Sequence, residues 1–176
     1  IESKKIIPII NSPEQLDIIE TSSKKLNYVL HIDTGMNRLG FQIKNFEENI
    51  NNIDFKRIKF VMSHFSSADD LNKNECNNQL KNLLKFKRIF NKPLSIANSA
   101  GIFLNRKYHL DIVRPGKSLY GINPYYKKNY KLKQVMSIYA PILQVTDLKK
   151  SQTIGYSQTF KTNKKIKIAT IDFGYS

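Results

Sequence analysis

Short apolar segments recur along the first two thirds of the chain, and the segments between them are polar with helical spacing. The apolar segments are residues 6–10, 28–32, 58–65, 94–98 and 110–114. This alternation predicts strand–helix units whose strands form a parallel sheet. Five such strands are too few to close an eight-stranded barrel of roughly 250 residues, but they suit the second half of one. An open doubly wound sheet is the alternative.

Two of the intervening helices carry clear local signals. The first is predicted to begin after Ser12 as N-cap, with Pro13 at the first helical position and Gln15 three residues beyond the cap. The longest is expected over residues 70–90. Its apolar positions predict a buried stripe made of Leu80, Leu83, Leu84 and Phe90.

The alternation of strand-like and helical segments stops after Pro124. A basic, turn-like segment is followed by long strand-like runs at 135–148 and 165–173 with no helix between them. We therefore predict an α/β fold: the second half of a (β/α)8 barrel over residues 1–128, followed by the start of a β-rich domain over residues 129–176. Because the chain begins with Ile1 and stops inside a strand-like run, we expect it to be a piece of a longer protein.

Composition narrows the class of protein. A hydrophobic content of 40% supports a folded core. No apolar run reaches the roughly 18 to 20 residues of a membrane helix, and no signal segment opens the chain, so we expect a soluble protein. Cys76 has no second thiol with which to pair or to build a cysteine metal site. These features favour a cytoplasmic location and predict no metal site.

The formal net charge of +15 raises nucleic acid as a possible partner. The lysines are spaced in ones and twos, however, as on a solvated surface. We therefore interpret the charge as a property of the surface and expect no nucleic-acid partner.

Candidate chemistry lies where the predicted strands end. In α/β barrels the loops that follow the strands carry the active site. Here these positions hold Arg38, His64, Ser99, Arg114 and Gly116. Two arginines with an imidazole and a hydroxyl suit an anionic, planar, phosphate-bearing ligand.

Each of these residues also has a purely structural explanation. Arg38 would be a surface side chain, His64 a satisfied strand-end histidine, Ser99 a helix cap and Gly116 a turn residue. Their joint placement at successive strand ends favours the functional interpretation.

Several motifs resemble those of one enzyme family in the same order and at similar spacing. They are HIDTGMNRLG, MSHFSSADD, SIANSAG, DIVRPGKSLYG and IGYSQTF followed by IDFGYS. The family is alanine racemase, whose members use pyridoxal 5'-phosphate to interconvert L- and D-alanine. The resemblance implies a barrel that holds the cofactor, a C-terminal β domain, a homodimer with sites completed across the interface, and a supply of D-alanine for peptidoglycan.

The resemblance also implies a role for individual residues. Arg38 is similar to the arginine that binds the cofactor's phenolic oxygen and the substrate, and His64 to the histidine packed on the pyridine ring. Arg114 resembles the arginine that faces the pyridine nitrogen, while Ser99, Gly116 and Lys117 resemble the phosphate site. Tyr156 resembles the catalytic tyrosine that moves the α-proton on one face, and Tyr175 the tyrosine that narrows the substrate entrance.

The chain departs from the family pattern in two respects. The motif with the lysine that anchors the cofactor is absent, as is a later β-domain motif, so the chain alone is expected to be inactive. His31 stands where many members have a lysine, and a neutral imidazole would not give the same charge pairing with Arg38. A broader-specificity racemase, a related barrel decarboxylase and a non-catalytic gene remnant are the alternatives.

Overall fold

The computed structural model describes residues 6–23, 25–44, 46, 51, 53–70, 73–125 and 130–174. The chain divides into two compact units, Ile1–Val135 and Met136–Ser176. Each is described by itself.

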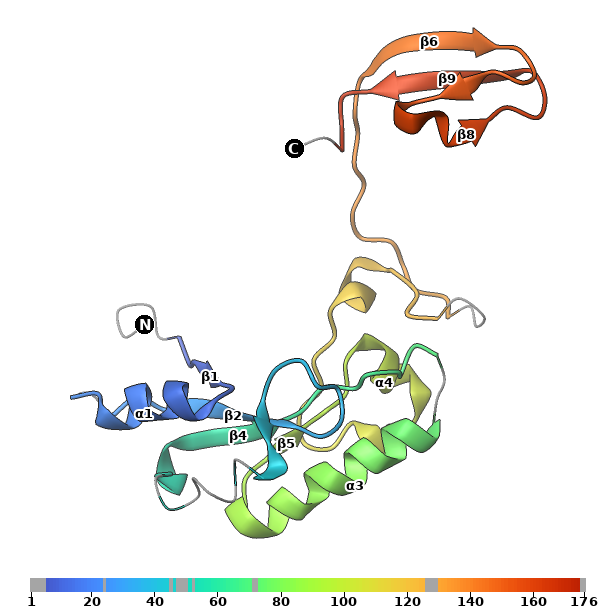
Figure 1. The fold of residues 1–176 in the computed structure, drawn as a ribbon. Helices are drawn as coiled ribbons and strands as arrows, with labels where there is room; N and C mark the ends of the chain where they lie inside the picture. Colours follow the sequence, from blue (N-terminus) through green and yellow to red (C-terminus); the bar gives the residue numbers. More distant parts are fainter. Residues whose placement is uncertain are drawn as a thin grey trace. The chain divides into compact units, whose positions relative to one another are not determined.

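The first unit is built on a parallel sheet whose strand order follows the chain (Figure 1). The order is β1-β2-β4-β5, and each neighbouring pair is parallel. The strands are β1 (Ile9–Ile10), β2 (Tyr28–Asp33), β4 (Ile58–Met62) and β5 (Leu94–Ser95), with β3 (Phe41–Gln42) paired to β2 off this path. Sequential parallel order is the arrangement of a barrel wall. The α/β prediction is therefore confirmed.

Helical segments connect these strands. The α-helices that the structure describes in full in this unit are α1 (Pro13–Thr21), α3 (Lys73–Phe90) and α4 (Ser99–Leu104). The short 3-10 helices are η3 (Phe55–Arg57), η4 (Arg106–Tyr108) and η5 (Lys117–Tyr120). None of the helices among the described residues has the length and apolar character needed to cross a membrane.

The predicted strand at 110–114 is largely absent. Within this segment only Ile112 makes a parallel bridge, to Ser95. The Asp111 carboxylate accepts the Leu94 N–H at 2.8 Å. The Asp111 carboxylate therefore occupies the Leu94 N–H. A longer strand at 110–114 would have paired this N–H with one of its backbone carbonyls.

The predicted N-cap and first helical residue of α1 are confirmed, but the Gln15 side chain has a different partner. The Ser12 hydroxyl accepts the Gln15 N–H at 3.4 Å, and Pro13 is the first helical residue. Gln15 reaches back as expected, but its Oε1 accepts the Asn11 N–H at 2.8 Å and not that of Ser12. The amide of Asn11 is thereby tied to the first turn.

The buried stripe of α3 differs from the predicted one at Leu84, which is 43% exposed, and at Leu80, which is only partly buried. The buried positions follow the helical spacing of three and four residues, and Leu84 lies one position off that stripe. They are Cys76, Gln79, Leu83, Phe86 and Phe90. Phe86 and Phe90 meet Phe46 edge to face, with ring centroids 5.0 and 5.3 Å apart.

A buried ion pair ties the amino ends of β2 and β4 to α1. Arg57 is 7% exposed and pairs with Glu20. Its guanidinium also donates to the carbonyls of Ile19 at 2.7 Å and Leu26 at 2.9 Å. Glu20 accepts the Tyr28 hydroxyl at 2.7 Å. Every strong donor in this cluster is satisfied, which is the condition for burying a charge without a large penalty.

The second unit is antiparallel. β6 (Ile142–Leu148) pairs with β9 (Ile166–Ile171), and β7 (Thr153–Ile154) pairs with β8 (Phe160–Lys161). The short helix η6 (Tyr156–Gln158) occupies the connection between β7 and β8. This confirms a β-rich second part.

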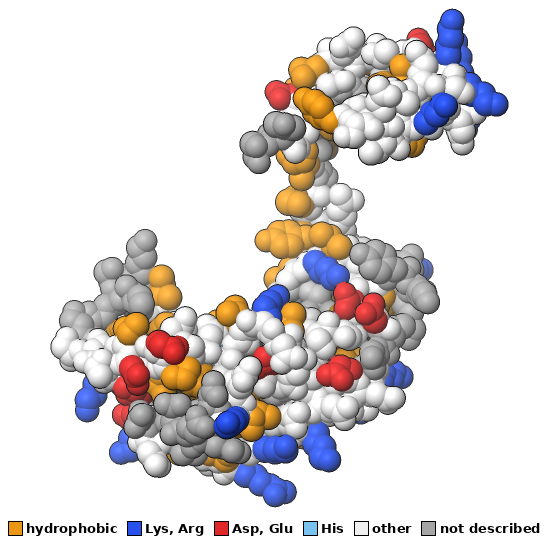
Figure 2. Space-filling model, in the orientation of Figure 1, with side chains coloured by type: hydrophobic (Ala, Val, Ile, Leu, Met, Phe, Trp, Pro, Cys, Tyr) orange, Lys and Arg blue, Asp and Glu red, His pale blue; other side chains and the backbone are white. Residues whose placement is uncertain are grey.

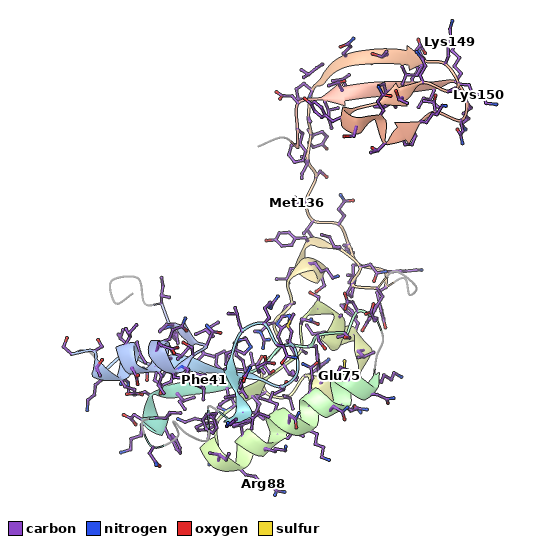
Figure 3. All side chains as sticks on the ribbon, viewed as in Figure 1. Phe41, Glu75, Arg88, Met136, Lys149 and Lys150 are labelled. Atoms are coloured by element: carbon purple, nitrogen blue, oxygen red, sulfur yellow. The ribbon has the colours of Figure 1, made fainter. Side chains whose placement is uncertain are left out.

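Charged side chains are dispersed over the surface. Figure 2 shows lysines and arginines spread along the edges of the first unit with acidic side chains among them. In the second unit, Lys149 and Lys150 lie at a turn and point outward (Figure 3).

The Arg57 cluster generates a stability prediction. Arg57→Met leaves the Glu20 carboxylate without its cation and should lower the free energy of unfolding by about 3 kcal/mol. Arg88→Met is the matched control, because Arg88 lies on the outer side of α3 and points away from the sheet (Figure 3). Urea unfolding followed by circular dichroism measures both. Equal effects of the two substitutions would contradict this role for Arg57.

Candidate functional site

The residues that follow the parallel strands meet around one cavity of about 330 Å³. It is lined by His64, Asp69, Asn98, Ser99, Ala100, Arg114, Gly116 and Lys117. The sheet brings these residues together because the carboxyl ends of parallel strands share one edge. The structure thus places five of the sequence-predicted residues at the same cavity.

Arg114 lies between the ends of β4 and β5. Its guanidinium donates to the Ser95 hydroxyl, to the Ser63 carbonyl and, at 3.3 Å, to Nδ1 of His64. Its backbone N–H donates to the carbonyl of Ala97 at 2.9 Å. Burial lowers the pKa of Arg114 to about 10, so the side chain remains a cation at neutral pH.

His64 is neutral at this site. Burial lowers its pKa below the ordinary value of 6.5, and the charges of Arg114 and Arg38 lower it further. A guanidinium only donates, so Nδ1 must accept and the ring proton lies on Nε2. The Asn98 amide nitrogen is 3.5 Å from Nε2, a longer contact than the one to Arg114. His64 therefore offers a donor to an acceptor in the cavity.

Gln79 holds the loop that carries His64. It reaches this loop from α3 and is fully buried. Its Oε1 accepts the Ser66 N–H at 3.0 Å, and its Nε2 donates to the His64 carbonyl at 2.9 Å. Sequence reasoning missed Gln79, although a polar residue on the buried stripe of an amphipathic helix was the available signal.

Ser99 does not cap α4, contrary to its structural interpretation. Asn98 is the N-cap, since its Oδ1 accepts the Gly101 N–H at 3.0 Å. The Ser99 hydroxyl instead accepts the N–H groups of Gly116 at 2.8 Å and Ser118 at 3.3 Å. Two backbone N–H groups and the Ser118 hydroxyl thus converge on the Ser99 oxygen. We call Ser99, Gly116 and Ser118 the N–H cradle.

Arg38 lies at the exposed tip of the loop after β2 and does not line the cavity. Asp33 Oδ1 holds the base of this loop by accepting the N–H groups of Gly35 and Met36, each at 2.9 Å. Among the described residues, the Arg38 guanidinium has no hydrogen bond or ion pair. Its charge nevertheless depresses the pKa of His64, so it lies within electrostatic reach of the cavity.

Tyr156 belongs to the second unit. It lies in η6 and is 92% exposed. Gly155 at φ 75° and Ser157 at φ 56° form the tight backbone on either side of it. Thr162, 3% exposed, closes the base of this segment through hydrogen bonds to Lys149 O at 2.7 Å and Gln152 O at 3.1 Å. Tyr175 lies outside the described residues.

The first unit is therefore a parallel barrel segment whose strand ends carry a fixed cation, a neutral imidazole and an N–H cradle. Such a rim is chemically suited to a planar anionic ligand. Two family models match the chain: alanine racemase, N-terminal domain, over residues 1–124, and alanine racemase, C-terminal domain, over residues 135–176. The chain belongs to the alanine racemase family.

Individual relatives agree with this membership. The alanine racemase of Rickettsia bellii is 37% identical over 97% of this chain and 44% of its own length. The alanine racemase of Bartonella henselae, solved with covalently bound pyridoxal phosphate, is 34% identical, with a TM-score of 0.74 over 98% of this chain and 50% of that one. The biosynthetic alanine racemase of Pseudomonas aeruginosa is 27% identical, with a TM-score of 0.75 over 95% and 49%. The chain spans about half the length of these relatives.

Gln79 generates a prediction about the His64 loop. Gln79→Leu removes the partners of the Ser66 N–H and the His64 carbonyl, so the Ser66 amide should exchange with solvent about 10-fold faster. Asn78→Leu, the same change at the exposed neighbouring position, is the control. Amide hydrogen exchange measured by NMR compares them. Unchanged protection of Ser66 in Gln79→Leu would contradict the positioning role.

Proposed function

We propose that the protein containing this chain is a pyridoxal-phosphate-dependent isomerase that interconverts L- and D-alanine. The observation that carries the proposal is the N–H cradle beside Arg114 and His64 at one cavity. Its context is a family in which the Bartonella henselae member binds pyridoxal phosphate covalently.

The residues present fit this cofactor. The N–H cradle, with the backbone of Lys117, suits a phosphate group because two backbone N–H groups and two hydroxyls lie together there. The carboxylate of Asp69 lines the same cavity. The half-buried ring of His64 offers a surface for the pyridine ring. When bound, pyridoxal phosphate supplies an electron sink for the α-carbanion of an amino acid.

Arg114 would face the ring nitrogen of the cofactor. Its contacts with Ser95 and Ser63 fix the guanidinium, and it can only donate. A fixed cation disfavours a proton on a nearby ring nitrogen, which moderates the electron sink and limits side reactions such as transamination. Arg38 would bind the phenolic oxygen of the cofactor and help to bind the substrate.

Racemisation removes the α-proton from one face and returns a proton on the other, so two bases on opposite faces are the economical solution. We assign one of them to Tyr156. The exposed position of its phenol in the described unit suits a group that completes the site of a partner subunit. Tyr175 would narrow the substrate entrance.

The wider assignments follow from the same proposal. We place the cofactor domain at residues 1–128 and the start of the β domain at residues 129–176. The protein would act as a cytoplasmic homodimer that supplies D-alanine for peptidoglycan. The chain alone, without the lysine that anchors the cofactor, would be inactive.

Ser99 tests the phosphate assignment. In the complete protein, Ser99→Ala should raise the Kd for pyridoxal phosphate about 10- to 100-fold, because a hydrogen bond to a charged group is lost. Binding of pyridoxal, which has no phosphate, is the internal control and should change by less than about 3-fold. Absorbance titration of the apoprotein measures both. Equal weakening of the two ligands would contradict a phosphate site at Ser99.

Tyr156 tests the proton-transfer assignment. Tyr156→Phe should lower kcat from L-alanine by about 10²- to 10⁴-fold, because it removes a proton-transfer group, while cofactor affinity stays within about 3-fold. Tyr139→Phe is the matched control, since Tyr139 is equally exposed in the same unit. Deuterium incorporation from solvent into L-alanine provides the measurement. A parallel loss of cofactor binding would contradict the assignment.

A further inference from the structure

Thr162 is a deeply buried polar side chain in the second unit. It is 3% exposed and comes directly after β8, at the base of the hairpin whose loop carries Tyr156. It is the only buried residue among those that the structure describes in this unit. Because a buried hydroxyl is normally hydrogen-bonded, its partners show what the burial serves.

The hydrogen bonds of Thr162 hold the turn that leads into β7. Its Oγ1 accepts the Gln152 N–H at 3.0 Å and donates to the carbonyl of Lys149 at 2.7 Å, with the Gln152 carbonyl 3.1 Å away. Its backbone N–H also donates to the Gln152 carbonyl, and its carbonyl accepts the Ser151 N–H, each at 2.8 Å. We call these contacts the Thr162 clamp.

The strand pairing next to the clamp is too short to fix the hairpin by itself. β7 and β8 pair only through Thr153 with Lys161 and Ile154 with Phe160. A two-stranded ribbon is marginally stable in water, and a slip of one residue would turn each side chain to the opposite face. Because the Thr162 clamp adjoins the first of these pairs, it fixes the register of both.

The loop that carries Tyr156 has an unfavourable backbone. Ser157 at φ 56° and Gln158 at φ 52° are consecutive residues in the left-handed region. Within the loop, the Gln158 N–H donates to the Gly155 carbonyl at 3.3 Å. Such a backbone persists only where the surrounding structure holds it, and the Thr162 clamp holds the base of this hairpin.

We propose that Thr162 is the positioning residue for Tyr156: the Thr162 clamp sets the register of β7 and β8 and thereby the direction in which the loop presents the phenol. The inference rests on the proposed role of Tyr156 in proton transfer. A proton-transfer group must lie within hydrogen-bond reach of the proton that it moves. A small displacement of the phenol therefore lowers the rate and leaves cofactor affinity unchanged.

The first test needs no ligand. Thr162→Val keeps the shape of the side chain and removes its hydroxyl, so the Gln152 amide of the complete apoprotein should exchange with solvent about 10-fold faster. The Gln158 amide, in the loop itself, should also exchange faster. Thr162→Ser retains the hydroxyl and should leave both amides within about 3-fold of the native protein. Unchanged exchange at either amide in Thr162→Val, measured by NMR, would overturn the proposal.

The second test measures proton transfer in the complete holoenzyme. Thr162→Val should lower kcat from L-alanine about 10-fold, with the Kd for pyridoxal phosphate within about 3-fold of the native value. Because Tyr156 is assigned to the α-proton of L-alanine, the primary isotope effect with α-deuterated L-alanine should rise and that with α-deuterated D-alanine should fall. A smaller folded fraction alone would move neither isotope effect.

Thr170→Val is the matched control for the kinetic test, since it makes the same change at an exposed position on β9. It should leave kcat and both isotope effects at their native values. Isotope effects that do not change in Thr162→Val, or a Thr162→Ser enzyme as slow as Thr162→Val, would overturn the proposal. If Tyr156→Phe keeps the native kcat, the proposed function of Tyr156 fails, while the exchange of the Gln158 amide still decides whether Thr162 holds the loop.

Discussion

The half-buried guanidinium of Arg114 makes the interactions on which the rest of the site depends. It joins the ends of two strands by donating to Ser95 on β5 and to the Ser63 carbonyl just after β4. It also determines which nitrogen of His64 accepts, and it adds to the effect of burial, which lowers the pKa of His64 and of His31. One cation thus orients the neighbouring imidazole and helps to keep both rings neutral.

Arg57, which is buried, and Arg114, which is half-buried, use the same side chain in two different ways. Arg57 is paired with the Glu20 carboxylate, so its charge is cancelled and it serves stability. Arg114 has only a hydroxyl, a carbonyl and an imidazole as partners among the described residues. Its charge is oriented but not cancelled, which is the condition for attracting an anionic ligand.

Sequence patterns predicted the features that depend on local spacing. The strands β2 and β4 and the Ser12 cap of α1 were found because periodicity and capping are local signals. The cap at Asn98, the burial of Gln79 and the lost strand at Ile112 were missed, because each depends on a partner distant in the chain or on competition between neighbouring caps. Of the predicted strand-end residues, His64, Ser99, Arg114 and Gly116 lie at one cavity because the parallel topology brings them together, whereas Arg38 does not line it.

His64 and His31 carry their ring protons on different nitrogens, because their hydrogen-bond partners differ. His64 accepts at Nδ1 from a cation and so offers a donor at Nε2, whereas His31 donates from Nδ1 to an amide and so offers an acceptor at Nε2. A carboxylate in place of either imidazole would place a negative charge close to Arg114, whereas the neutral rings do not. The constraint that makes this possible is burial among cations, which holds the pKa of both rings below the ordinary value.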